Sequence, residues 1–190
     1  MKRTGVALPL LVLALTSLSL GSAGCASASV YSKREPGELP RLSRLFVAGS
    51  SQGLDDSAPL GELSSAMTKQ LSARGVASSA YVFESAELSS PEPLRQRLAE
   101  SQADGLLLLT LSATEGWIAS GGMGGVAAER TTTTRVEALL TPAGSDRRIW
   151  SATCKYGNKS RATQAILDTC AQKLVEQLFT DGVLTPSGTP

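Results

Sequence analysis

The chain has 190 residues, of which 42% are hydrophobic and 18% are charged, and this composition is typical of one globular domain. Its 18 basic and 17 acidic residues nearly cancel, which gives no electrostatic reason to expect nucleic acid as a partner. The sequence contains no histidine, which excludes Ser-His-Asp and Cys-His catalysis and the usual histidine-based zinc sites.

The first 24 residues have the features of an export signal. Lys2 and Arg3 form a positively charged start, and the apolar run 6–20 that follows has the length of a signal peptide and is shorter than a membrane span. Small residues come next, as signal peptidases require, and they allow two different cleavage sites.

In the first interpretation, cleavage occurs before Cys25, and this cysteine then carries a diacylglycerol on its thiol and an acyl chain on its amino group. Leucine usually stands three residues before such a cysteine, whereas this chain has Ser22. In the second interpretation, Ala26-Ser27-Ala28 is the cleavage site, and a soluble protein starts near Ser29. The Ala-Gly-Cys triplet at the end of the apolar run favours the first, so Cys25 is the predicted lipidation site. In enterobacterial lipoproteins an aspartate after the cysteine retains the protein in the inner membrane, and Ala26 therefore implies outer-membrane sorting by resemblance.

Residues 25–40 are small, polar and interrupted by proline, which predicts a flexible tether. A single α/β domain is expected over residues 41–184, followed by a disordered tail at 185–190.

The first half of this domain is predicted to alternate strands with helices. Leu60, Leu63, Met67 and Leu71 recur at intervals of three and four residues, which is the spacing of one helix face. The apolar run "LLLLTL" at 106–111 follows a helix stop directly and predicts a central strand that is buried on both faces. The expected elements are strand 41–48, helix 59–74, strand 77–83, a short helix over 90–103 and strand 106–111.

Residues 115–130, "EGWIASGGMGGVAAER", are predicted to form a long glycine-rich connection. Long connections in compact domains are usually functional or disordered. One interpretation is a binding loop that meets a partner protein or the membrane surface, with Trp117, Ile118, Met123 and Val126 as candidate contact residues. The other is the tip of a disordered hairpin.

The second half of the domain is predicted to contain two more strands, 131–141 and 147–156, and a long helix over 160–180. Trp150 and Cys154 share one face of the last strand, and Cys170 lies on the apolar stripe of the helix. If the helix packs on that face, the two cysteines can form a disulfide, as expected in an exported chain. Two buried free thiols are the alternative. Trp150 is expected in the core, with an exposed binding residue as its alternative.

The predicted fold is therefore α/β: a single mixed sheet of about five strands with three packed helices, in the order strand-helix-strand-helix-strand-strand-strand-helix. The first three strands should be parallel and the last two antiparallel.

Three short motifs in this order carry a resemblance. Ala103-Asp104 precedes the hydrophobic strand, Ala143-Gly144 lies in the turn between the last strands, and Trp150-Ser151 follows it. This pattern, over residues 41–182, resembles a family of outer-membrane lipoproteins that includes CsgG and LpoB, and the N-terminal domain of TolB shares the architecture. The resemblance implies an accessory protein of the cell envelope.

We therefore predict a non-enzymatic, lipid-anchored adaptor on the periplasmic face of the outer membrane, with no catalytic residue, metal or cofactor. Its predicted partners are outer-membrane lipid, through Cys25, and an envelope protein involved in envelope assembly, secretion or cell-wall synthesis, with self-association possible and nucleic acid excluded. The alternative is a soluble periplasmic ligand-binding protein or hydrolase. The absence of histidine argues against a hydrolase, and an aromatic content of 4% argues against a carrier.

Overall fold

The computed structural model describes residues 28–51, 58–84, 86–122, 125–158 and 164–185. The predicted signal peptide, Cys25, Met123 and most of the predicted tail lie outside these residues.

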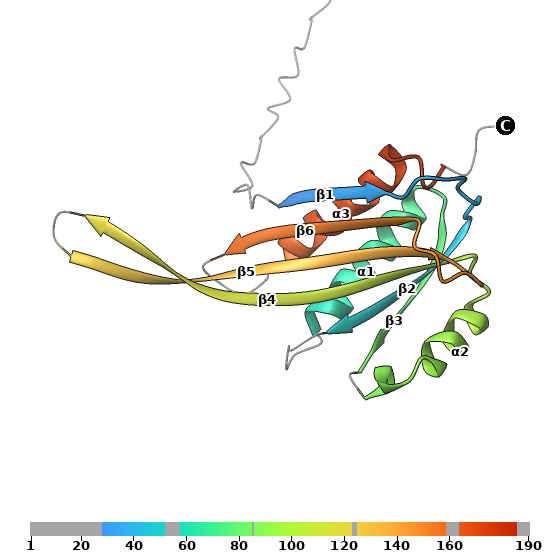
Figure 1. The fold of residues 1–190 in the computed structure, drawn as a ribbon, viewed down its shortest axis with the longest axis horizontal. Coiled ribbons are helices and arrows are strands. Elements are labelled where there is room, and N and C mark those ends of the chain that lie inside the picture. Colours follow the sequence, from blue (N-terminus) through green and yellow to red (C-terminus); the bar gives the residue numbers. More distant parts are fainter. Residues whose placement is uncertain (1–27, 52–57, 85, 123–124, 159–163, 186–190) are drawn as a thin grey trace, which may run out of the picture.

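One six-stranded mixed sheet forms the centre of the molecule, with the strand order β1-β6-β5-β4-β2-β3 (Figure 1). Strands β2, β3 and β4 are parallel, whereas β4, β5, β6 and β1 pair antiparallel with their neighbours. The α/β class, the single mixed sheet and the three helices are confirmed, and the sheet has one strand more than expected. The strands are β1 (Ser29–Arg34), β2 (Arg44–Ser51), β3 (Ala77–Phe83), β4 (Gly105–Gly122), β5 (Gly125–Pro142) and β6 (Trp150–Asn158).

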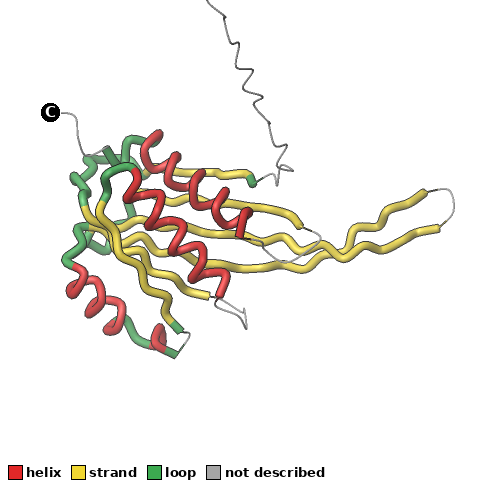
Figure 2. Tube along the Cα trace, turned by 180° about the vertical axis from the view of Figure 1, so that it is seen from behind, coloured by secondary structure: helices red, strands yellow, loops and turns green. Residues whose placement is uncertain are grey.

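Helices α1 (Ala58–Ala73) and α3 (Gln164–Thr180) cover one face of this sheet, as Figure 2 shows from behind. The predicted stripe of α1 is fully buried there, on a sheet surface that includes Val47 and Leu109. Gly49 allows the close approach, because a Cβ atom at this position would lie 2.9 Å from the Cγ atom of Leu60. The main core therefore lies between the two helices and the sheet.

Helix α2 (Glu92–Ser101) follows a 3₁₀ turn (Glu87–Ser89) and packs on the other face, over β2, β3 and the start of β4. Right-handed crossovers explain the opposite sides, because the chain moves one way across the sheet from β2 to β3 and the other way from β3 to β4. A second, smaller core forms here around Phe46, Ala48 and Phe83.

The structure corrects the predicted tether, because residues 29–34 form the edge strand β1. Ser29 pairs with Lys155 and Arg34 with Trp150, so the strand completes the open edge of β6. Its sequence, "SVYSKR", has one aliphatic residue, Val30, which packs against the main core. The partner strand, far away in the sequence, determines this conformation, and local composition therefore gave no signal.

The prediction of a long glycine-rich connection at 115–130 is also wrong. Strands β4 and β5 are each 18 residues long and pair continuously from Gly105 and Pro142 to Gly122 and Gly125. The two strands extend as a hairpin well beyond the rest of the sheet (Figure 1). Antiparallel pairing that is already established in the body continues outward through the small residues, which explains why the glycines do not end the strands.

Candidate functional site

The N-terminal end of β1 and the projecting hairpin lie at the same end of the sheet. Strand β1 is antiparallel to β6, and β6 is antiparallel to β5, so β1 and β5 run in the same direction. Ser29 lies opposite Lys155, which in turn lies opposite Arg135. The N-terminal end of β1 therefore faces the side on which β5 begins and the hairpin projects (Figure 1).

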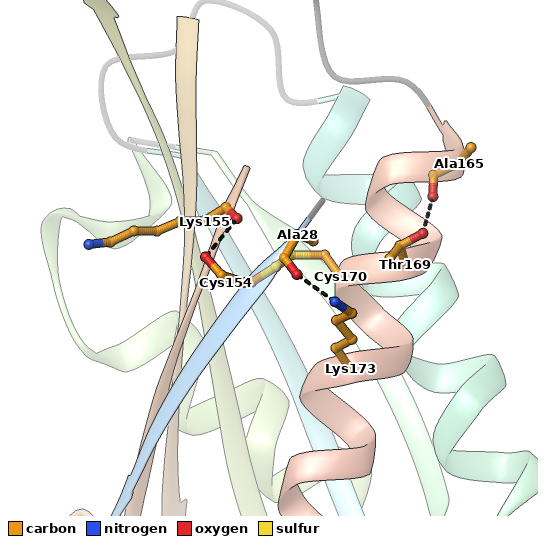
Figure 3. The surroundings of a disulfide bond; sticks show 8 residues. Ala28, Cys154, Lys155, Ala165, Thr169, Cys170 and Lys173 are labelled. Carbon is orange, nitrogen blue, oxygen red and sulfur yellow. Dashed lines mark hydrogen bonds between the residues drawn. A yellow bond between two sulfur atoms is a disulfide. The ribbon is translucent and has the colours of Figure 1, made fainter. Parts of the chain in front are cut away.

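Polar contacts hold the N-terminal end of β1 in place. Ala28 is buried, and its carbonyl oxygen accepts a hydrogen bond from Nζ of Lys173 on α3 (Figure 3). This bond fixes the residue three positions after Cys25.

A disulfide joins β6 to α3 just beside this contact. Cys154 and Cys170 are fully buried, their Cα atoms lie 6.1 Å apart, and their sulfur atoms are bonded (Figure 3). The strand face and the helix stripe that carry them are those expected from the sequence. The cross-link fixes the helix that in turn holds Ala28.

At the other end of β1, a carboxylate collects several hydrogen bonds. Asp181 accepts from Nε1 of Trp150 at 2.7 Å and from Nε2 of Gln177 at 2.8 Å, and its backbone carbonyl accepts from Arg34 at 3.3 Å. Burial raises the pKa of Asp181, but the hydrogen bonds from Trp150, Ser32 and Gln177 and the charge of Arg34 outweigh it, so the pKa lies below its usual value. Trp150 is fully buried, which confirms it as a core residue.

The candidate contact residues of the sequence fall on the hairpin. Trp117 and Ile118 belong to β4, opposite Arg130 and Glu129, and Val126 belongs to β5, opposite Gly121. Strand β6 ends at Asn158, opposite Thr132, and β2 ends at Ser51, opposite Leu111. Within the described part of the chain, residues 116–122 and 125–131 therefore pair only with one another.

A groove of about 720 Å³ lies at the opposite end of the strands. It runs between α2 and the turn after β5, and its walls include Leu94, Leu98 and Leu106, with Arg95 and Asp146 among its polar residues.

Asp104, quoted above for the family resemblance, has a structural role beside this groove. Its carboxylate accepts hydrogen bonds from the backbone N–H groups of Ser43 and Arg44, at 2.8 and 3.0 Å, and from the Ser43 hydroxyl at 2.8 Å. Its own N–H donates to the carbonyl of Arg44, and its carbonyl accepts from Ala143. The aspartate thus joins the starts of β2 and β4 to the turn after β5.

Sequence reasoning missed Lys173 and Asp181. Their partners lie 145 and 31 residues away, so no local pattern marks them. Among the described residues, no group of three or more histidine, cysteine, aspartate or glutamate side chains could hold a metal ion. None of the helices in the described ranges is long and apolar enough to cross a membrane.

No protein-family model matches the chain, and no curated protein matches it. Among solved structures, the chain is similar to the PelC dodecamer from Paraburkholderia phytofirmans, with 15% identity and a TM-score of 0.51 over 80% of this chain and 97% of that one. A single-residue variant of the same PelC gives 16% identity and a TM-score of 0.51, over 80% and 98%. A minor lipoprotein from Acinetobacter baumannii matches with 11% identity and a TM-score of 0.37, over 75% and 96%. At these identities the likeness to PelC concerns the fold alone, and membership of the CsgG- and LpoB-like family stays a prediction.

Proposed function

We propose that this chain is a lipid-anchored, non-enzymatic accessory protein on the periplasmic face of the outer membrane. Cys25 carries the lipid, and the folded body binds a protein partner in envelope assembly, secretion or cell-wall synthesis. The observation that carries the proposal is the small-residue segment ending in Cys25 directly after the apolar run of the export signal.

The buried disulfide supports an exported location. Disulfides persist in oxidising compartments such as the bacterial periplasm and are rare in the cytosol. Cys154 and Cys170 have no solvent exposure and link two elements of the core, which is the arrangement of a structural rather than a redox-active pair.

The chemistry of the acidic residues supports a binding role rather than catalysis. The sequence offers no histidine as a general base. Two carboxylates with several hydrogen bonds, Asp104 and Asp181, bind backbone and core groups that hold strands together.

Intact-mass spectrometry of the protein purified from native membranes tests the anchor. We expect a chain that begins at Cys25 and carries diacylglyceryl and acyl groups, and a Cys25→Ala variant that lacks this mass and leaves the membrane fraction. A wild-type chain that begins near Ser29, or one without acyl mass, would contradict the proposal.

Cross-linking in intact envelopes, followed by affinity capture, tests the partner. We expect a specific envelope protein in the cross-linked product of the anchored chain and its loss for Cys25→Ala. Co-expression of two differently tagged copies separates this outcome from self-association, which the dodecameric PelC structure makes worth testing. A product that contains no second polypeptide would count against an adaptor.

A second candidate function, binding of a small apolar ligand, has the groove beside α2 in its favour. Its volume of about 720 Å³ falls within the range of known ligand sites, and several leucines line it. Native mass spectrometry of the purified Cys25→Ala protein would detect such a ligand as extra mass. A Leu98→Trp variant, which fills the groove, should abolish that mass, and an unliganded wild-type chain would argue against this function.

A further inference from the structure

We propose that the tip of the β4–β5 hairpin lies in the interfacial region of the same membrane that holds the lipid of Cys25. The hairpin tip is defined here as residues 116–122 and 125–128. The inference rests on the lipid anchor proposed above, and it assigns the projecting hairpin to a lipid surface rather than to a protein.

The relative reach of the two segments carries the argument. Ser29 lies level with Arg135, since both are opposite Lys155 in the ladder. From Arg135, strand β5 extends ten residues further out to Gly125, which is about 33 Å at about 3.3 Å per residue. Cys25 is four residues from Ser29, a span of at most about 14 Å.

The N-terminal end of β1 and the hairpin lie on the same side of the body (Figure 1). A lipid on Cys25 would therefore keep the start of β1 within about 14 Å of the membrane surface. The hairpin reaches about 33 Å beyond the level of Ser29, which is more than this distance. With this end of the sheet toward the bilayer, the hairpin lies along the bilayer surface or enters it.

The sequence of the tip suits a membrane interface. No residue from Gly116 to Ala128 carries a charge, and Glu115 and Glu129 flank this run. The run contains Trp117, and tryptophan is enriched at the level of the lipid headgroups. The apolar residues Ile118 and Val126 add to its affinity for the boundary between headgroups and acyl chains.

Backbone hydrogen bonding limits how deep the tip can lie. Each of its strands pairs with the other on one side only, so the outer N–H and C=O groups need water or headgroups as partners. Hydrocarbon offers none, and open strand edges are excluded from it. A two-stranded hairpin is also marginally stable in water alone. At the membrane interface, water and headgroups can pair with the outer N–H and C=O groups, and the hairpin is not left in water alone.

Fluorescence quenching in vesicles tests this placement. The native acylated chain is reconstituted into vesicles of phosphatidylethanolamine and phosphatidylglycerol that contain phosphatidylcholine with brominated acyl chains. Trp150 is buried in the core and contributes a background, so the Trp117→Phe variant is measured in parallel and subtracted. We expect the Trp117 emission to be blue-shifted and quenched, more strongly by bromines near the headgroups than by bromines near the chain ends.

A charge in the tip provides the matched comparison. Ala119→Lys should lose most of the quenching. Ser72→Lys, which adds the same charge at an exposed position on α1, should retain it. Quenching equal to that of Trp117→Phe, in vesicles that retain the acylated chain, would overturn the inference and leave the anchor intact. If the native chain is found to carry no acyl group and does not bind the vesicles, the anchor and the inference are overturned together.

Discussion

At the level of single residues, Asp104 is the clearest test of how the sheet is held together. Its carboxylate accepts three hydrogen bonds from the start of β2. We expect Asp104→Ala to lower the free energy of unfolding by about 1 to 2 kcal/mol, because two backbone N–H groups lose a charged acceptor at a half-buried position. Urea unfolding followed by circular dichroism measures this change.

Asp146, an exposed acid in the turn after β5, provides the control. Its replacement by alanine should change the stability by less than about 0.5 kcal/mol. Equal effects of the two substitutions would show that Asp104 is no more than a surface charge.

Asp181 predicts a dependence of stability on pH. Its pKa is lowered in the folded state, so the stabilisation is complete above the unfolded-chain value of about 3.9 and is lost as the pH falls through the folded pKa. We expect Asp181→Asn to be less stable than the wild type at neutral pH and the difference to shrink in acid. Glu35→Gln is the comparison, since hydrogen bonding and charge from Lys33 and the charge of Arg148 lower the pKa of half-buried Glu35. A difference between Asp181→Asn and the wild type that is the same at every pH would refute this role.

At the level of elements, the disulfide between β6 and α3 should contribute measurably to stability. Closing a loop between residues 16 apart stabilises a fold by about 3 kcal/mol in the chain-entropy treatment. We expect reductant to shift the urea midpoint of the wild type to that of a Cys154→Ala, Cys170→Ala double variant, and to leave the variant unchanged. Thiol titration of the unfolded, unreduced protein should find neither cysteine free.

The elements also show where sequence reasoning succeeded and where it could not. Helix α1 followed from apolar spacing and the first part of β4 from an apolar run, because burial requires these side chains in any arrangement of the sheet. Strand β1 could not be predicted from the sequence, since its conformation depends on pairing with β6, more than a hundred residues later. The outer hairpin could not be predicted either, because glycine and alanine are poor strand formers and only an existing antiparallel ladder extends through them.

At the level of the whole molecule, the short distance from Cys25 to β1 should determine how the body sits on the membrane. Inserting about ten Gly/Ser residues between Ala26 and Ser27 adds up to about 35 Å of reach, which exceeds the excess length of the hairpin. We expect the inserted chain to stay in brominated vesicles and to lose the quenching of Trp117. The same residues appended after Pro190 should have no effect, and undiminished quenching after insertion would mean that the tip binds lipid without help from the anchor.

Much of the candidate site could be named from the sequence, but its arrangement could not. Residue type and position indicated Cys25 and Trp117 as candidates, which stay predictions, and the cysteine pair, which is bonded in the structure. That the N-terminus and the hairpin face the same side follows from two successive antiparallel pairings, and this depends on the strand order rather than on any motif. Lys173 and Asp181 act on residues that only the folded chain brings near.

The pairing of β1 with β6 has a consequence for the timing of maturation. Ser29 and its neighbour Lys155 are 126 residues apart. Under the proposed function, the N-terminal segment therefore has nowhere to dock until most of the polypeptide has emerged during export. The cysteine would be accessible to the processing enzymes throughout that interval, and we expect acylation to precede closure of the sheet. Pulse-chase labelling should therefore detect the acylated chain before it becomes protease-resistant, and the opposite order would show that β1 docks without waiting for its lipid.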